Sequence, residues 1–470
     1  MIERRRVPFL AAACALATVL VFLPAATFPF LNWDDVVNVV SNPNLNFSAS
    51  GLRWMAEGAL LGHWHPLAWL TFAADRAIWG TDPFGYHLTN VLLHASSAAL
   101  LFLLARRLLR EDAAALFSAL FWAWHPLRVE PVAWVTERRD VLSGVLILAS
   151  LLAYVRGAEE GDSAGGRSFR RMAFAFGASA MAAKVFAVVL PAALLVLDAR
   201  LRGRPRWKEK LPWALPAAVA LAFNVSAQEA GGAAVSVARF GLGARLAQAA
   251  YGLVFYAWKT VCPTGLGPLY ERSLLLEPLP FFVSTAVALA AAGLLWRSRL
   301  RYPWLAQAML AYALLALPAL GLFKSGRMTA ADRYSYLPGI PLSLLAGALC
   351  ARLRLKTART TAFLVVLSLA ALSRVQLQVW SSDGALWTRA CAVSPLSYFA
   401  RLKLAEADEA SGRIGAAAAD RTDAERLHAE VFARAAAIYA ARGDQAAAAA
   451  ARARVQAGLE TLSPAPRMIK

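Results

Sequence analysis

The sequence has little charge, few cysteines and no nucleotide-binding motif. Only 17% of the 470 residues are charged and 59% are hydrophobic, whereas a soluble globular domain is about 25% charged and about half apolar. So apolar a chain is not intrinsically disordered. Apolar runs long enough to cross a membrane recur from residue 8 to residue 378, which excludes a single water-soluble core and predicts an all-α, polytopic transmembrane helical bundle.

The four cysteines are scattered along the chain and show no Cys-x-x-Cys spacing, which excludes a metal knuckle. The chain also lacks the His-Glu-x-x-His motif of zinc enzymes, and it has no Gly-x-Gly-x-x-Gly or Walker-type loop. The sequence therefore argues against a catalytic zinc site and against use of a nucleotide on the cytoplasmic side.

Basic residues outnumber acidic ones by 49 to 30, which gives a formal net charge of +19. Basic chains often bind nucleic acid, but here the basic residues form short clusters between apolar runs, which is the positive-inside pattern. The pattern predicts a cytoplasmic N-terminus, an extracytoplasmic C-terminus and no nucleic-acid partner. The Ala- and Arg-rich composition favours a bacterial inner membrane, with the C-terminus in the periplasm. The clusters are Arg4–Arg6, Arg106–Arg110, Arg200–Lys210, Arg297–Arg301 and Arg352–Arg359.

We expect about 11 spans, with outer loops at 31–87, 126–140 and 321–336. The run 172–197 carries Lys184 in its middle, and a lysine buried in the membrane is costly. We therefore expect that run to form a hairpin with Lys184 near its outer tip. The apolar runs are 8–30, 88–106, 113–125, 141–155, 172–197, 211–227, 245–261, 281–296, 303–320, 337–351 and 360–378.

The composition changes at Trp380, which predicts a membrane domain over 1–379 and a small extracytoplasmic helical domain over 380–470. The second segment contains no span, and its heptad-like apolar spacing is interrupted at Gly412 and Gly443. Residues 402–413 and 436–444 resemble the helix–turn junctions of tetratricopeptide repeats. About two degenerate units are present, fewer than a free-standing array needs, so we expect them to pack on the membrane domain.

Two adjacent carboxylates, Asp34 and Asp35, follow the first span directly. Both cannot be desolvated cheaply without a cation, water or a reaction to stabilise them. One of them could accept the proton of an incoming hydroxyl group as a general base. The alternative is a solvated loop in which an aspartate caps the next helix.

A second polar segment, from His125 to Asp140, lies between two short spans. Because both spans are barely long enough to cross, the segment is expected to lie below the outer surface in a hollow, where ionisable residues usually mark a site. An ion-pair network that only braces the loop is the alternative. The charged residues are Arg128, Glu130, Glu137, Arg138, Arg139 and Asp140.

A third segment, from Lys324 to Pro338, places the cations Lys324, Arg327 and Arg333 on the outer side. Outer cations beside a membrane cavity suit a lipid-linked phosphate, which arginine can bind at two atoms. The alternative is an anchor for lipid headgroups.

Taken together, these segments resemble the transmembrane-and-tetratricopeptide-repeat family of protein O-mannosyltransferases and its bacterial relatives, which are GT-C glycosyltransferases. The resemblance covers nearly the whole chain. It is carried by Asn32-Trp33-Asp34-Asp35 with Asn42-Pro43, by His65-Pro66-Leu67, by His87 to His94, by His125-Pro126-Leu127-Arg128-Val129-Glu130, by Glu137-Arg138-Arg139-Asp140 and by Asp332-Arg333-Tyr334-Ser335-Tyr336-Leu337-Pro338.

The resemblance implies a GT-C type fold and an inverting transfer of a sugar, mannose in that family, to a hydroxyl acceptor. The donor would be a polyprenyl-phosphate sugar that enters from the outer leaflet, and the acceptor a Ser or Thr of a protein outside the membrane. The base would be Asp34 or Asp35. Relatives often carry Glu where this chain has Asp332, and the repeat region is short here, so the acceptor stays open.

On this hypothesis the leaving lipid phosphate is held by Arg138, Arg139, Lys184, Arg333 and Tyr336. Glu137 and Asp140 would orient Arg138. A Mg²⁺ or Mn²⁺ ion that bridges Asp35 and the phosphate is left open. The residues that would line the sugar pocket are His65, His125, Glu130, Glu137 and Asp140.

Two other functions stay open. One is a GT-C enzyme that glycosylates a lipid or an envelope glycan. The other is a non-enzymatic membrane scaffold whose repeat domain binds a protein.

Overall fold

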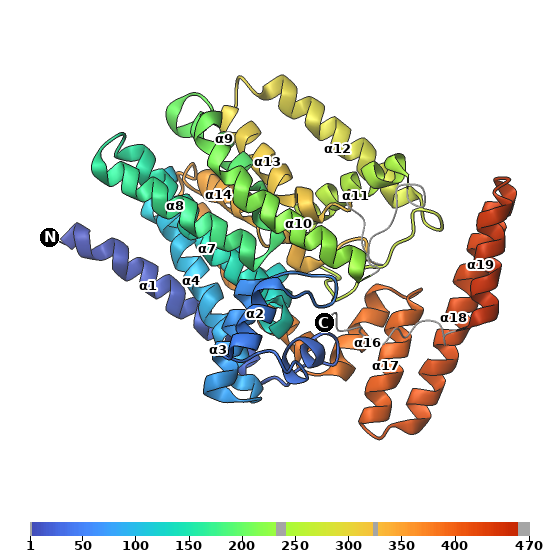
Figure 1. Ribbon diagram of the computed structural model, residues 1–470. Helices are drawn as coiled ribbons and strands as arrows, with labels where there is room; N and C mark the ends of the chain where they lie inside the picture. Colours follow the sequence, from blue (N-terminus) through green and yellow to red (C-terminus); the bar gives the residue numbers. More distant parts are fainter. Residues whose placement is uncertain (1, 232–240, 323–327, 459–470) are drawn as a thin grey trace.

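The chain forms a helical bundle, as the computed structural model shows (Figure 1). It describes all residues except 1, 232–240, 323–327 and 459–470. The described residues form no β-strand, only isolated bridges between Leu60 and His63 and between Tyr270 and Ala330. The predicted all-α class is therefore confirmed. Lys324 and Arg327 lie outside the described residues.

The α-helices follow one another along the chain, and several of the longer connections among them contain short 3₁₀ or π turns. They are α1 (Ile2–Phe22), α2 (Ala49–Glu57), α3 (Pro66–Trp79), α4 (Pro83–Leu109), α5 (Asp112–Ala123), α6 (Val129–Ala133), α7 (Arg138–Glu159), α8 (Ala164–Ala183), α9 (Leu190–Arg202), α10 (Ala214–Ala230), α11 (Leu242–Val261), α12 (Leu279–Ser298), α13 (Pro303–Ala316), α14 (Gly339–Cys350), α15 (Lys356–Leu377), α16 (Asp383–Val393), α17 (Tyr398–Ala410), α18 (Ile414–Ala441) and α19 (Gln445–Ala457).

Five helical segments among the described residues are long and apolar enough to cross a membrane, which makes this a multi-pass membrane protein. They contain α1, α4, α7, α12 and α15, and three shorter apolar helices, α5, α13 and α14, lie among them. The other expected spans do not reach this length and hydropathy, so the number of about eleven stays a prediction.

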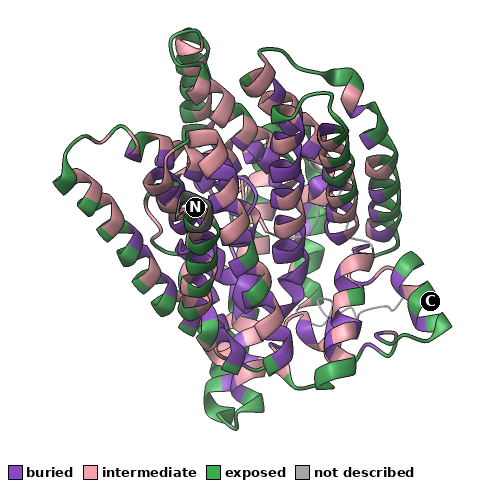
Figure 2. Cartoon of the chain, turned by 90° about the vertical axis from the view of Figure 1, so that its left-hand side faces the viewer, coloured by how far each residue is buried: buried purple, intermediate pink, exposed green. Residues whose placement is uncertain are grey.

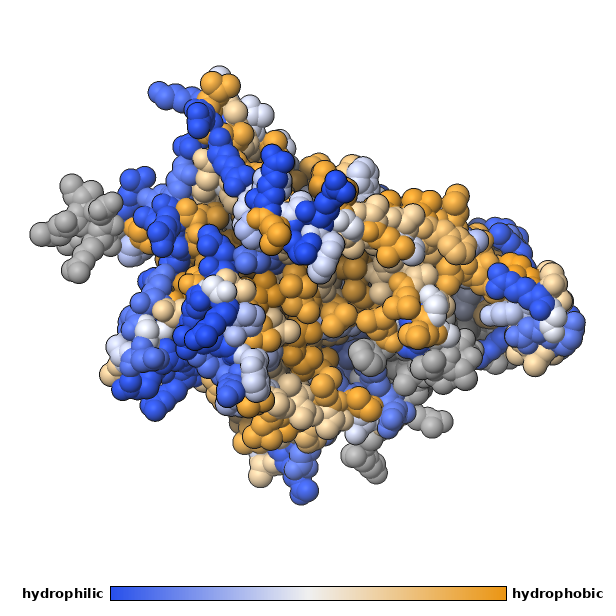
Figure 3. All heavy atoms as spheres, turned by 90° about the horizontal axis from the view of Figure 1, so that it is seen from above, coloured by the Kyte–Doolittle hydropathy of each residue, from blue (hydrophilic) through white to orange (hydrophobic). Residues whose placement is uncertain are grey.

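The helices differ in how far the bundle encloses them. In the segment that contains α7, 72% of its most apolar 18-residue stretch is buried. In α12, only 11% of the corresponding stretch is buried. Buried residues gather in the central helices, and exposed residues follow the outer ones (Figure 2). Seen from above, apolar side chains cover the middle of the surface and hydrophilic ones its edges (Figure 3). Such an apolar exterior is typical of a surface that contacts lipid.

The chain reverses direction at Lys184, as the sequence predicted. Helix α8 ends at Ala183, Lys184 has extended backbone, and α9 follows after the 3₁₀ turn η5 (Val185–Val189). The tip of this hairpin contacts the start of α7, and its open end contacts the region near the end of α7. Lys184 Nζ donates to Asp140 Oδ1 at 2.6 Å, at the start of α7. The Tyr154 hydroxyl, near the end of α7, donates to Asp198 Oδ1 at 2.6 Å.

The segment after Trp380 is helical and partly shares the core of the bundle. Trp387 and Leu404, from α16 and α17, belong to the same hydrophobic cluster as residues of α4 and α7. The next helices extend away from the bundle (Figure 1). Gly412 lies between α17 and α18, and Gly443 lies between α18 and α19. Both have positive φ, at 77° and 79°. Glycine adopts this conformation without steric cost. The tetratricopeptide assignment and the boundary at residue 380 stay predictions.

Candidate active site

A polar cavity of about 130 Å³ lies where the three predicted polar segments meet. It is large enough for several water molecules or a small polar group. Five residues predicted for the site line it together: Asp34, His65, Arg139, Lys184 and Arg333. The other lining residues are Trp33, His63, Trp64, Trp134, Val185, Phe186, Asn224, Met328 and Tyr334.

Two of the predicted histidines owe their position to the proline that follows each of them. A residue before proline is biased away from helical backbone, and proline fits the first turn of a helix. His65 therefore lies just before α3, which begins at Pro66. His125 lies just before a 3₁₀ turn that begins at Pro126. The imidazole of His65 reaches the cavity, and His125 does not.

Asp34 and Asp35 are adjacent in the chain but have different surroundings. Asp35 is fully buried, and its Oδ2 accepts a hydrogen bond from the Leu31 N–H at 3.0 Å. Its Oδ1 accepts from the backbone N–H of Thr136 at 2.8 Å and from the Thr136 hydroxyl at 2.7 Å. Asp34 is only partly buried and lines the cavity. Asp35 therefore joins the first polar segment to the second, and Asp34 is the carboxyl that a substrate can reach.

Burial shifts the pKa values of Asp34, Asp35 and His63 toward the neutral form of each group. It raises the pKa of Asp34 to about 6, against the opposing effect of Arg139, and that of Asp35 to about 7. Burial lowers the pKa of His63 to about 3, so His63 is neutral at physiological pH. A carboxyl that titrates near 6 is suited to accept a proton near neutral pH.

Glu137 is fully buried and holds three cations in place. Arg139 donates to it from Nε at 3.1 Å and from Nη2 at 2.6 Å. Arg333 Nε lies 3.1 Å from its Oε1, and Lys184 Nζ lies 3.5 Å from its Oε2. An arginine carries five N–H donors and a lysine three. Arg139 and Lys184 therefore keep donors free for a ligand in the cavity.

Arg333 is also held by Glu130, which was predicted for the sugar pocket. The Arg333 N–H donates to Glu130 Oε2 at 2.8 Å, and its guanidinium forms an ion pair with the same carboxylate. Burial raises the pKa of Glu130, and Arg333 opposes that shift. Glu130 therefore fixes the cation and does not itself line the cavity.

Two residues predicted to hold the phosphate, Arg138 and Tyr336, lie away from the cavity. Arg138 is fully buried, and its Nη2 donates to Asp75 Oδ2 and to the Tyr86 carbonyl, both at 2.7 Å. The Tyr336 hydroxyl lies 2.9 Å from His94 Nδ1, within the core. Both residues brace the helices that carry the site.

The expectation that Glu137 and Asp140 orient Arg138 is corrected by these contacts. Asp75 pairs with Arg138, whereas Glu137 and Asp140 pair with Arg139 and Lys184. The reason is helical geometry, because successive residues at the start of α7 point about 100° apart. Arg138 and Arg139 therefore face different neighbours.

His125 likewise contributes to packing. Its Nδ1 accepts a hydrogen bond from the Leu127 N–H at 3.2 Å, and its Nε2 lies 3.1 Å from the Thr260 carbonyl oxygen. This contact joins the second polar segment to the end of α11.

The residues around Asp35 do not fit a divalent cation. All three donors to Asp35 are N–H or O–H groups, and they occupy both of its oxygens. Within the described ranges, no group of three or more His, Cys, Asp or Glu side chains could hold a metal ion. Three of the roughly four acceptor positions of the Asp35 carboxylate are therefore already taken.

The sequence did not single out the aromatic wall of the cavity or Asn224. Trp33 stacks on Trp134 with ring centroids 4.4 Å apart, and Trp387 contacts Trp33 at 5.1 Å. The motifs contain Trp33 and Trp134, so their tryptophans were a usable signal. Asn224 lies in an apolar run, and its Nδ2 donates to the Trp64 carbonyl at 3.3 Å. The one signal in the sequence was the position of this polar amide within an apolar run, where it needs a hydrogen-bond partner.

Part of the chain that carries this site matches a known family. Residues 66–227 match the model of dolichyl-phosphate-mannose-protein mannosyltransferases. The matched range contains His125 to Asp140 and Lys184, but neither Asp34 nor Arg333.

Curated relatives with the same kind of name match shorter stretches. Protein O-mannosyl-transferase TMTC1 of Homo sapiens is 32% identical over 140 residues, which cover 27% of this chain and 16% of that protein. TMTC2 of Mus musculus is 37% identical over 105 residues, 21% of this chain and 13% of that protein. Tmtc1 of Drosophila melanogaster is 35% identical over 154 residues, 31% and 18% of the two chains. The matches thus span less than a fifth of each relative.

Among solved structures, the crystal structure of ArnT from Cupriavidus metallidurans in the apo state matches with a TM-score of 0.44 and 16% sequence identity, over 97% of this chain and 78% of that chain. The resemblance that the motifs indicated is confirmed over residues 66–227, which match the dolichyl-phosphate-mannose-protein mannosyltransferase family.

Proposed function

We propose that the protein is an integral membrane glycosyltransferase that uses a polyprenyl-phosphate sugar as donor. The observation that carries the proposal is that the Asp34 carboxyl and three cations, Arg139, Lys184 and Arg333, line one cavity. A displacement at a sugar carbon needs a base for the incoming hydroxyl and positive charge for the departing phosphate. The family model and the names of the relatives support mannose as the sugar and a protein as the acceptor.

In the proposed reaction, the acceptor oxygen bonds to the anomeric carbon as the bond from that carbon to the phosphate oxygen breaks. The configuration at the carbon inverts. The proton of the acceptor passes to Asp34, which is the base in this proposal. Asp35 holds the backbone next to Asp34 through Thr136 and Leu31.

The phosphate would leave as an anion, and its growing charge would be stabilised by Arg139, Lys184 and Arg333. Glu137 holds all three in position before the substrate arrives. Groups fixed in advance need no reorganisation during the reaction, which is the main source of electrostatic catalysis. A neutral His63 and His65 in the same cavity can donate or accept hydrogen bonds to sugar hydroxyls.

For the location, we propose a bacterial inner membrane with the cavity on the periplasmic side and the N-terminus in the cytoplasm. The basic segments between α12 and α13 and between α14 and α15 support this orientation under the positive-inside rule. The alternative acceptors are a lipid or an envelope glycan, and the alternative role without catalysis is a scaffold.

The test is release of polyprenyl phosphate from polyprenyl-phosphate mannose by the purified protein, with incorporation of label followed in protein and lipid fractions. Label in protein supports the O-mannosyltransferase form of the proposal, and label in lipid or glycan supports the other transferase. If the protein neither binds nor cleaves any polyprenyl-phosphate sugar, the scaffold replaces the enzyme.

A further inference from the structure

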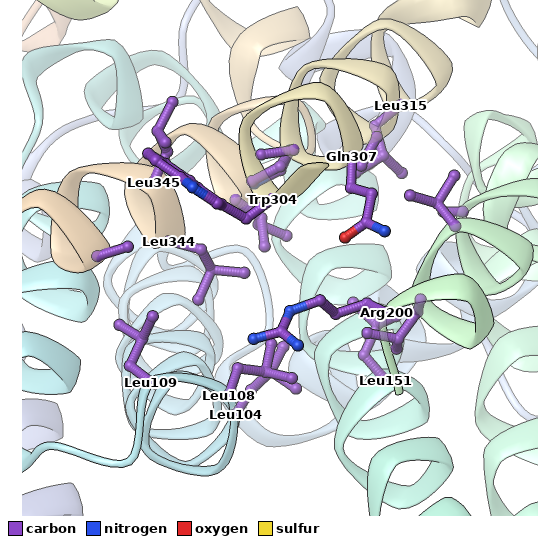
Figure 4. Close-up of a pocket in the computed structure, with 18 of the residues that line it drawn as sticks. Leu104, Leu108, Leu109, Leu151, Arg200, Trp304, Gln307, Leu315, Leu344 and Leu345 are labelled. Carbon is purple, nitrogen blue, oxygen red and sulfur yellow. The ribbon is translucent and has the colours of Figure 1, made fainter. Parts of the chain in front are cut away.

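A second cavity, of about 440 Å³, lies between α4, α7, α9, α13 and α14, and it is almost entirely apolar. Leucine side chains from several of these helices form its walls (Figure 4). Its volume lies within the range of about 300–1,000 Å³ that is typical of ligand sites. An apolar cavity of this kind in a membrane protein is filled by a hydrocarbon chain more favourably than by water.

The few polar groups of this cavity are cationic or uncharged. They are Arg200, Arg352 and Gln307, and Trp304 adds an aromatic ring. Figure 4 shows the Arg200 guanidinium and the Gln307 amide pointing into the space between the helices. Arg352 lies over the Trp304 ring, with its guanidinium carbon 4.5 Å from the centroid. Within the described chain neither arginine forms an ion pair with a carboxylate, and no acidic residue lines the cavity.

The arginine end of this cavity and the candidate active site lie toward opposite ends of the bundle, and the apolar part of the cavity extends along α14 from Arg352 to Ile340. In the active site, Arg139 lies in the first turn of α7, and Lys184 lies just before the 3₁₀ turn that leads into α9. Leu151 and Arg200 of the second cavity lie well along α7 and near the end of α9. The distance from Arg139 to Leu151 along α7 is about 18 Å at 1.5 Å per residue.

We propose that the second cavity binds an anionic glycerophospholipid of the leaflet opposite the active site. One acyl chain would lie between α9, α13 and α14, and the phosphodiester would pair with Arg200 and Arg352. The Gln307 amide would donate to an ester carbonyl of the glycerol backbone. Basic pockets between transmembrane helices on the cytoplasmic side are a recurrent way to bind such headgroups.

Arg200 and Arg352 determine which class of lipid the cavity prefers. A zwitterionic phospholipid would fill the apolar part equally well, but its own ammonium group offsets the charge of its phosphodiester, so it pairs less favourably with two arginines. A detached phosphate would satisfy the arginines but leave the apolar walls empty. A lipid with a net negative headgroup therefore matches the apolar walls and the two arginines better than either.

The proposal is tested by native mass spectrometry of the full chain, after exposure to mixtures of phosphatidylglycerol and phosphatidylcholine. The wild-type protein should retain phosphatidylglycerol in preference. The double variant Arg200→Gln, Arg352→Gln should bind it about 30-fold more weakly, from about 1 kcal/mol for each basic residue. The matched control is Arg301→Gln with Arg354→Gln, which removes the same charge near the same end of the bundle from residues that do not line the cavity.

Ala348→Phe, which fills the apolar part, should reduce retention of both lipids, and the fold of each variant is checked by its melting temperature. Phosphatidylglycerol should also raise the melting temperature of the unaltered protein more than phosphatidylcholine does. Equal retention of the two lipids by wild type would overturn the proposal. So would an equal loss in the control pair, which would indicate general surface attraction. Displacement of phosphatidylglycerol by polyprenyl phosphate would assign the cavity to the donor chain instead. None of these readouts depends on transferase activity.

Discussion

Thr136 holds Asp35 with two hydrogen bonds. Its backbone N–H and its hydroxyl both donate to Asp35 Oδ1, at 2.8 and 2.7 Å. With the Leu31 N–H on the other oxygen, the buried Asp35 carboxylate accepts three hydrogen bonds from the protein. The neighbouring Asp34 lines the cavity beside the cations. Two adjacent aspartates that look equivalent in the sequence thus have separate roles, one in structure and one in the proposed chemistry.

Asp34→Asn is expected to reduce sugar transfer by about 10²–10⁴-fold, which is the usual contribution of a general base. Donor affinity should change little, because the cations stay in place. Transfer rate and donor binding are measured separately on the purified variant. Full activity of Asp34→Asn would show that Asp34 is not the base.

The matched changes at Asp35 should act on stability instead. Asp35→Ala leaves three buried donors without a partner, at about 1–3 kcal/mol each. Thr136→Val removes only the hydroxyl and should lower stability by about 1 kcal/mol. Melting in detergent checks both. A Thr136→Val protein with unchanged melting temperature but no activity would contradict this division of roles.

The pH dependence of transfer follows from the pKa of Asp34, which burial raises to about 6. A base must be ionised to accept a proton, so below pH 6 the protonated carboxyl is inactive and above it the ionised form accumulates. We expect kcat/KM for the donor, which reports the free enzyme, to rise with pH through about 6. His63, with a pKa of about 3, does not titrate in this range.

Asp35 has a pKa of about 7, so its ionisation could also produce a rise of kcat/KM with pH, here called the pH limb. The residual activity of Asp34→Asn separates the two carboxyls. A flat residual profile assigns the limb to Asp34, and a limb that persists near 7 assigns it to Asp35.

Lys184 and Lys210 provide a matched pair of buried cations at opposite ends of α7. Lys184 donates to Asp140 at 2.6 Å, and Lys210 pairs with Asp198 at 2.7 Å. Lys184→Met leaves Asp140 without its ion-pair partner, which costs about 3–5 kcal/mol, whereas Lys210→Met should cost less because Asp198 keeps its contacts with Tyr154 and Arg202. Only Lys184→Met should also weaken donor binding, by about tenfold or more, since a hydrogen bond to a charged group contributes about 1.5–3 kcal/mol.

The measurement is binding of labelled polyprenyl phosphate to both variants at a temperature where both remain folded. Equal weakening in Lys184→Met and Lys210→Met would mean that the effect on affinity arises from destabilisation and not from the site.

The sequence carried enough information to identify the charged residues of the cavity. Charged residues in short segments between apolar runs must either reach water or pair, and this rule singled out Asp34, Arg139, Lys184 and Arg333. The reversal at Lys184 followed from the cost of burying a lysine in lipid. Both arguments depend on residue type and order alone.

What the sequence could not provide was the direction of each side chain. Arg138 and Arg139 are neighbours of the same type, but only Arg139 reaches the cavity. That difference depends on where α7 begins and which residues it meets. Asn224 shows the same limit, because its partner Trp64 is distant in the chain and packing alone brings them together.

Gly144 provides a test of the packing behind the site. A Cβ atom at this position would overlap the ring of Tyr336, which is fully buried. Gly144→Ala must therefore displace Tyr336 or α7, and overpacking of this kind costs about 1–3 kcal/mol. Gly293, in α12, has no neighbour within 4 Å, so Gly293→Ala should instead stabilise the helix by about 0.5–1 kcal/mol. Opposite shifts in melting temperature are expected, and equal shifts would contradict the contact.

Truncations can show which of the last four helices the membrane bundle requires. Trp387 and Leu404 belong to the same hydrophobic cluster as the bundle, and Asp383 accepts a hydrogen bond from the Asn32 N–H at 2.8 Å, close to Asp34. No residue of α18 or α19 belongs to that cluster. A chain that ends after Ala410 should keep its melting temperature and donor binding. A chain that ends after Trp380 exposes Trp33 and should lose both, because the Trp33–Trp387 contact and the Asp383 bond support the loop of the proposed base. If the shorter chain keeps both properties, the boundary at residue 380 separates two independent units. If the longer chain loses them, α18 and α19 contribute to the bundle through contacts other than this core.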